Sequence, residues 1–106
     1  MLTDPLLEKL VNLLRPYDPE KIILFGSRAR GEGDEFSDYD VVVIKATDQP
    51  FLERLKEMVP YILDFDRAVE VLVYTPEEFE AMKESGLGWV IHQEGQVLYE
   101  RSPGGS

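Results

Sequence analysis

The chain has 106 residues and a mass of 12.1 kDa, near the commonest size of a single domain, so we expect one hydrophobic core. Its 11 Lys and Arg stand against 21 Asp and Glu, a net charge of −10 that disfavours unaided binding to nucleic acid or to an anionic membrane. The absence of Cys excludes disulfides, thiolate nucleophiles and Cys-type zinc sites. No apolar run is long enough to span a bilayer and the first residues lack the basic flank of a signal peptide, so we expect a soluble cytoplasmic protein.

Hydrophobic periodicity and turn residues predict alternating helices and strands. The predicted order is helix, strand, strand, helix, strand, helix, strand, at residues 5–14, 21–25, 38–44, 51–63, 68–74, 76–83 and 95–99. Pro60 ends or kinks the second helix, and Gly-Leu-Gly at 86–88 breaks the third before one more helical turn at 89–92. This order predicts an α/β (α+β) fold, in which helices flank a small mixed sheet of about four strands.

The runs at 38–44 and 68–73 are apolar on both sides, which predicts buried strands, whereas the strand at 95–99 is expected at an edge. We expect one domain at residues 1–100 and a flexible C-terminal tail at 101–106, which contains Pro-Gly-Gly. The acidic residues Glu77, Glu78 and Glu80 are expected to form a solvated helix face, and the single histidine, His92, to lie at the surface or at a helix end.

Two carboxylates lie at the beginning of the strand predicted at 38–44. Asp38 and Asp40 stand two residues apart, so their side chains leave the same face of the strand, with Cα atoms about 6.6 Å apart. Asp is unfavourable in strands and the two charges repel each other, so we infer a compensating cation. The alternative is a turn rich in Asp that caps the strand, and for an isolated Asp-x-Asp that alternative would be preferred.

A third carboxylate, Glu70, interrupts the apolar run at 68–73. A buried carboxylate must be paired, protonated or bound to a metal, because an isolated buried charge is very costly. If its strand lies beside that of Asp38, the three acids can face one point, and a set of oxygen ligands alone fits Mg²⁺ or Mn²⁺. The structural alternative is a salt bridge, for which basic residues exist at Lys45, Arg54 and Arg67.

Gly26 and Ser27 follow the strand at 21–25 directly. Glycine lets the backbone come close to a ligand, and Ser27 can cap a short helix whose N–H groups suit phosphate oxygens. Arg28 and Arg30 add positive charge in an otherwise acidic chain. Strand-to-helix turns often need such residues for structural reasons alone, and no Gly-Lys-Ser/Thr follows as in a Walker A loop.

Together these motifs resemble the nucleotidyltransferase superfamily of DNA polymerase β type. More closely, the chain is similar to the minimal nucleotidyltransferases, the MNT-domain proteins of prokaryotes. Ten residues separate Ser27 from Asp38, and an acid follows at position 70. The resemblance covers nearly the whole chain and is carried by Gly-Ser-Arg-Ala-Arg-Gly at 26–31, Ser-Asp-Tyr-Asp at 37–40 and Val-Tyr-Thr-Pro-Glu-Glu-Phe at 73–79.

The resemblance implies a role for each motif residue. Gly26, Ser27 and Arg30 would form the nucleotide-binding motif, with the first two holding the β- and γ-phosphates of ATP or another nucleoside triphosphate. The resemblance makes the acids Asp38, Asp40 and Glu70 the catalytic ligands of two divalent ions, Mg²⁺ or Mn²⁺. The family commonly has an aspartate at the third of these positions, and the extra methylene of Glu70 would shift the carboxylate by about 1.5 Å.

The resemblance also implies an activity and a partner. It implies metal-dependent transfer of a nucleoside monophosphate, in the first instance AMP, to a hydroxyl group. MNT proteins typically act beside an all-helical HEPN-family protein, as the antitoxin of a toxin–antitoxin pair, and some transfer AMP to a tyrosine of that partner, so we expect a hetero-oligomer. The alternatives are a non-catalytic nucleotide-binding module that neutralises its partner by contact, and a small-molecule nucleotidyltransferase.

Overall fold

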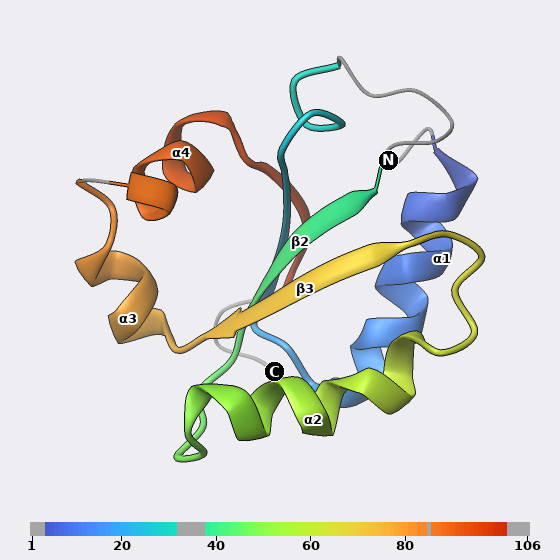
Figure 1. The fold of residues 1–106 in the computed structure, drawn as a ribbon, viewed down its shortest axis with the longest axis horizontal. Helices are drawn as coiled ribbons and strands as arrows, with labels where there is room; N and C mark the ends of the chain where they lie inside the picture. The colour runs from blue at the N-terminus through green and yellow to red at the C-terminus, as the bar shows by residue number, and fades with distance from the viewer. Residues whose placement is uncertain (1–3, 32–37, 85, 102–106) are drawn as a thin grey trace.

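A mixed sheet forms the centre of the protein, as the sequence predicted. The computed structural model describes residues 4–31, 38–84 and 86–101 (Figure 1). Its strands are β1 Lys21–Phe25, β2 Tyr39–Ile44, β3 Val69–Tyr74 and β4 Gln96–Glu100, in the spatial order β3-β2-β1-β4. β2 pairs antiparallel with β1 and parallel with β3, and β4 pairs antiparallel with β1. The central position of β2 and the edge position of β4 are therefore confirmed.

The helices differ from the prediction mainly around the glycines that follow residue 85. The helical elements are α1 Pro5–Leu14, the 3₁₀ helix η1 Arg15–Tyr17, α2 Phe51–Ile62, α3 Pro76–Ala81 and α4 Gly86–Glu94. Gly86 and Gly88 were predicted to interrupt a helix, but they lie in the first turn of α4. A Cβ on Gly88 would be 1.9 Å from the Met82 carbonyl oxygen, so this glycine permits close packing of α4 on the end of α3.

Two helical layers enclose the sheet, α1 and α2 on one face and α3 and α4 on the other (Figure 1). On the first face, the buried side chains of the strands are mainly aliphatic and come from alternate positions: Ile22, Leu24, Val41, Val43, Val71 and Val73. The second face carries the intervening positions, Ile23, Phe25, Val42 and Ile44, which pack with Ile91 of α4. Because side chains alternate along a strand, Tyr39 belongs to the α1/α2 face and Asp40 to the α3/α4 face.

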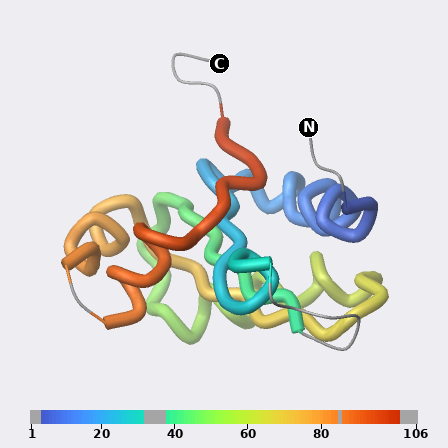
Figure 2. The backbone as a smooth tube through the Cα atoms, turned by 90° about the horizontal axis from the view of Figure 1, so that it is seen from above, coloured from blue at the N-terminus to red at the C-terminus, as the bar shows by residue number. Residues whose placement is uncertain are grey.

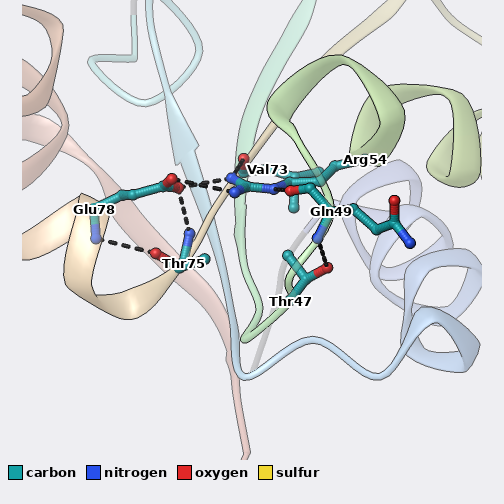
Figure 3. Close-up of polar contacts among 6 residues, drawn as sticks. All are labelled: Thr47, Gln49, Arg54, Val73, Thr75 and Glu78. Atoms are coloured by element: carbon teal, nitrogen blue, oxygen red, sulfur yellow. Dashed lines mark hydrogen bonds and ion pairs between the residues drawn. The ribbon is translucent and has the colours of Figure 1, made fainter.

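A buried arginine fixes α2 to the beginning of α3 (Figure 3). Arg54 is 5% exposed, and its guanidinium donates to both carboxylate oxygens of Glu78 at 2.7 and 3.1 Å. It also donates to the carbonyl oxygens of Gln49 and Val73. The Glu78 carboxylate accepts a further hydrogen bond from the Thr75 N–H and completes a capping box. Glu78 is exposed, as expected for a solvated helix face, and it also pairs with Arg54, a contact that the sequence did not predict.

The end of the described chain is attached to the sheet. The Arg101 N–H donates to the Glu20 carbonyl oxygen at 2.9 Å, and the Arg101 guanidinium lies 3.1 Å from Asp18. Arg101, which was assigned to the tail, thus continues the ordered chain, and the predicted flexibility of residues 102–106 lies outside the described residues. No helix in the described ranges is long and apolar enough to cross a bilayer.

Candidate active site

The two motifs meet where β1 ends and β2 begins. Phe25 pairs with Asp40 across the antiparallel strands, so the next residue, Gly26, lies beside the Asp40 side chain. Gly26 has a φ of +79°, and a Cβ placed on it would be 2.5 Å from Oδ2 of Asp40. Glycine is needed here both for the left-handed backbone and for the space that the carboxylate occupies. The structure therefore brings the glycine of one motif and an acid of the other into direct contact.

Asp40 also lies beside Glu70 on the same face of the sheet. The two residues are register partners in the parallel pair β2 and β3. Burial raises the pKa of Asp40, and the neighbouring Glu70 carboxylate, followed by Asp38, raises it further. Neighbouring carboxylates therefore oppose the ionisation of Asp40, and a cation would neutralise this concentration of negative charge.

Glu70 is not buried, contrary to the prediction. β3 is an edge strand, and only Val71 and Val73 of its side chains are fully covered, by the α1/α2 layer. Glu70 is exposed on the opposite face, at the beginning of the strand. Of its expected partners, Arg54 binds Glu78 and Lys45 binds the Tyr17 carbonyl oxygen. The apolar run could not show this exposure, because a continuous apolar sequence fits an edge strand whose second face is only half covered.

Asp38 lies just outside β2 and is exposed. In the described ranges, no three side chains of His, Cys, Asp or Glu are gathered closely enough to hold a metal ion. The structure thus places two of the three predicted ligands, Asp40 and Glu70, side by side. The charged oxygen donors of this pair fit Mg²⁺ or Mn²⁺, both of which keep several waters and need few protein carboxylates.

Hydrogen-bonded turns at residues 27–31 follow Gly26, where the sequence predicted a phosphate-binding element. The Gly26 carbonyl oxygen accepts from the N–H groups of Ala29 at 3.1 Å and Arg30 at 3.3 Å. The amides of Ser27 and Arg28 precede the first of these bonds, and such leading N–H groups of a helical turn favour anions. Ala29 is buried, and its carbonyl oxygen accepts from the Gln96 side chain at 2.6 Å. Figure 2 shows this turn beside β4 and above the beginning of β2.

The two arginines of the turn have different surroundings. The Arg28 guanidinium lies 3.9 Å from the centre of the Tyr39 ring, on the side of the sheet away from Asp40. Arg30 lies 3.9 Å from Glu94, the last residue of α4, and α4 covers the face that carries Asp40. The sequence pointed to both arginines as a source of positive charge but gave no signal for the contact between Arg28 and Tyr39.

We expect Gly26→Ala to disrupt the site more than the backbone strain alone explains. Alanine in the left-handed region costs about 1–2 kcal/mol, and here its Cβ would also displace Oδ2 of Asp40. Gly31→Ala is the matched control, because Gly31 has a φ of +75° but a Cβ on it would meet no atom of the described residues within 4 Å. Denaturant unfolding and Mg²⁺-dependent ATP binding of both variants separate the effects. Equal loss of binding in the two variants would contradict the role of the Gly26 contact.

Comparison with known proteins identifies the family. A family model described as nucleotidyltransferase domain matches residues 6–91. The chain belongs to this nucleotidyltransferase family. It is also 32% identical over 84 residues to a protein of Methanocaldococcus jannaschii with the provisional name protein adenylyltransferase, covering 76% of this chain and 78% of that protein. The fold and the enzyme class implied by the motifs are thereby confirmed: the protein is a nucleotidyltransferase.

Solved structures of the same fold include members of toxin–antitoxin pairs. A nucleotidyltransferase from Sulfolobus solfataricus has a TM-score of 0.65 at 18% identity, with 91% of this chain and 81% of that chain covered. A toxin–antitoxin structure with AMP-PNP has a TM-score of 0.62 at 21% sequence identity, with 90% of this chain and 73% of that chain covered. The structure of a tri-AMPylated HEPN toxin of Shewanella oneidensis in complex with MNT antitoxin has a TM-score of 0.56 at 19% sequence identity. It covers 91% of this chain and 71% of that chain. These likenesses establish the shared fold.

Proposed function

We propose that this nucleotidyltransferase moves AMP from ATP to a tyrosine hydroxyl of a HEPN-family partner, as the antitoxin of a toxin–antitoxin pair. The observation that carries the proposal is the contact between Gly26 and Asp40, which brings the turn that follows Gly26 against an acid pair. A nucleoside triphosphate with a divalent ion matches both halves of the site, the turn and the acid pair. Its phosphates suit the turn, and the ion suits the carboxylates. Neither half alone would favour a nucleotide over another ligand.

Each site residue has a separate role in this proposal. Asp38, Asp40 and Glu70 would hold Mg²⁺ or Mn²⁺, which supplies charge stabilisation for the transferred phosphoryl group and activates the attacking hydroxyl. Gly26, Ser27 and Arg30 would bind the β- and γ-phosphates and align the α-phosphorus with the acceptor. Ser27 is an anchor and not a nucleophile, because the chain's single histidine, His92, stacks on Phe79 and contacts the Phe79 carbonyl oxygen.

The proposed acceptor and partner draw support from the relatives. The related protein of M. jannaschii has a name that gives proteins as its substrate class. A structure of the same fold is the MNT antitoxin in complex with an AMPylated HEPN toxin. The acidic charge of −10 also disfavours a polynucleotide as the acceptor.

The test is transfer from ATP labelled at the α-phosphate. Mixed with its HEPN-family partner and Mg²⁺, the protein should place label on a tyrosine of the partner and release pyrophosphate. The α-label is decisive, because nucleotidyl transfer keeps this phosphate with the acceptor whereas a kinase leaves it on ADP. Label that remains in free nucleotide, despite formation of a stable complex, would overturn the proposal.

Two observations favour a second function, neutralisation of the partner by contact alone. The described part of the chain holds no complete three-ligand metal cluster, and Glu70 replaces the aspartate common in the family. In this alternative the nucleotide binds without turnover. The labelling experiment separates the two functions, since the contact mechanism predicts complex formation without transfer.

A further inference from the structure

We propose that Tyr39 is a positioning residue that joins the two halves of the nucleotide site through a brace to Arg28. The inference rests on the proposed function, because it concerns how the same site is held in place. Tyr39 stands between Asp38 and Asp40 in the sequence and is 1% exposed. Its ring lies on the sheet face opposite to Asp40, so it is placed to support the acids without reaching the reacting atoms.

Tyr39 is fixed by three separate contacts, two through its side chain and one through its backbone. Its hydroxyl donates to Oδ2 of Asp4 at 3.1 Å, while Oδ1 of Asp4 accepts from the Leu6 N–H and caps α1. The ring of Phe65 meets it edge-on at 5.3 Å and 81°. Its backbone N–H donates to the Ala68 carbonyl oxygen, just before β3, at 3.0 Å. A ring held by the N-cap of α1 and by Phe65, on a backbone bonded to Ala68, is a fixed platform at the beginning of β2.

Arg28 connects this platform to the phosphate-binding turn. Its guanidinium lies 3.9 Å from the ring centre, well within the range of a cation–π contact. Arg28 is the second residue of the turn at 27–30, so the contact ties the turn to the strand that carries Asp40. Arg30 instead lies near Glu94, on the side of the acids. The geometry therefore places Arg28 against the Tyr39 ring and Arg30 on the sheet face of the acids, where it contacts Glu94.

The test compares Tyr39→Leu, Arg28→Ala and the double variant in calorimetric titrations with AMP-PNP and Mg²⁺. A partly buried cation–π contact corresponds to a change in affinity of about 3- to 30-fold. We expect each single variant to bind about 10-fold more weakly and the double variant to lose no more than that. If Arg28 contacted phosphate independently of Tyr39, the losses would multiply to about 100-fold.

Three controls separate positioning from stability and from direct charge contact. Val43→Ala removes buried volume on the same sheet face and should lower the melting temperature without changing affinity for AMP-PNP. Tyr39→Phe keeps the ring under Arg28 and should retain affinity within about threefold. For Arg28→Ala, the affinity ratio to wild type should stay constant between low and high salt, whereas loss of a phosphate contact would shrink as salt rises.

The outcomes distinguish this inference from the proposed function. Unchanged affinity of Tyr39→Leu, beside tight binding by the wild type, overturns the positioning role alone. If the losses of affinity multiply in the double variant, or if the affinity ratio of Arg28→Ala to wild type changes with salt, Arg28 contacts the phosphate. Either result also overturns the positioning role. A wild type that binds no AMP-PNP with Mg²⁺ overturns the proposed function, and the positioning role with it.

Discussion

Asp40→Asn should lower the rate of AMP transfer by on the order of 10³-fold. The substitution keeps the shape of the side chain but removes the half-buried charge that faces both Gly26 and Glu70. The measurement is the initial rate of α-label transfer to the HEPN-family partner at saturating ATP. Complex formation with the partner should persist, because the substitution alters one carboxylate at the base of the site.

The same variant has a second expected outcome, in stability. The pKa of Asp40 is raised in the folded protein, so its ionised form destabilises the fold above the pKa of the unfolded chain. Without metal at neutral pH, Asp40→Asn should therefore unfold at the same or a higher denaturant concentration than the wild type. Loss of activity together with loss of stability would contradict the proposed site.

Asp66→Asn is the matched control for both measurements. It makes the same chemical change at an exposed carboxylate, which pairs with Lys9 at 3.1 Å on the surface. We expect transfer at the wild-type rate, because Asp66 is not among the motif residues and exposed ion pairs contribute little to stability. Equal losses in Asp40→Asn and Asp66→Asn would show that net charge, and not the site, controls the rate.

The sequence allowed prediction of those features that depend on local pattern. Strands of β-branched residues and helices of periodic apolar residues are read from short spacings, and the structure contains both. In contrast, the meeting of Gly26 with Asp40 depends on the antiparallel pairing of β1 with β2, which the strand pattern did not predict.

Other features depend on contacts between distant residues and left no clear signal. Whether β3 is central or at an edge depends on how many strands assemble beside it, so the exposure of Glu70 could not be read from its apolar neighbours. The pairing of Arg54 with Glu78 joins positions 24 residues apart, and each looks like an ordinary surface residue of its own helix. The Tyr39 hydroxyl likewise donates to Asp4, 35 residues before it.

Arg54→Met should destabilise the protein by about 3 kcal/mol, because it removes a nearly buried charge partner and leaves several acceptors unpaired. Methionine has a similar length, so loss of packing is small and the effect reports the polar contacts. The measurement is denaturant unfolding at pH 7, and nucleotide binding by the same variant serves as an internal check. An unfolding free energy within 0.5 kcal/mol of wild type, on the order of a surface substitution, would contradict the importance of the pair.

Glu78→Gln tests the same pair through its pH dependence. Hydrogen bonds from Arg54 and then from the Thr75 backbone lower the pKa of Glu78 from 4.5 to about 2. A carboxylate with a lowered pKa stabilises the fold above about pH 4.5, and this stabilisation is lost as the pH falls toward 2. Because the Glu78 side chain is 46% exposed, solvent screening reduces the expected contribution to about 1–2 kcal/mol.

The wild type should therefore lose stability between pH 4.5 and pH 2 more steeply than Glu78→Gln, which keeps a capping side chain but cannot titrate. Glu80→Gln is the matched control, since Glu80 lies on the same helix and pairs with Lys83 at the surface. Its acid unfolding should follow that of the wild type. If the Glu78→Gln and Glu80→Gln curves coincide, the bidentate pair does not control acid stability, and another group must hold α2 and α3 together at low pH.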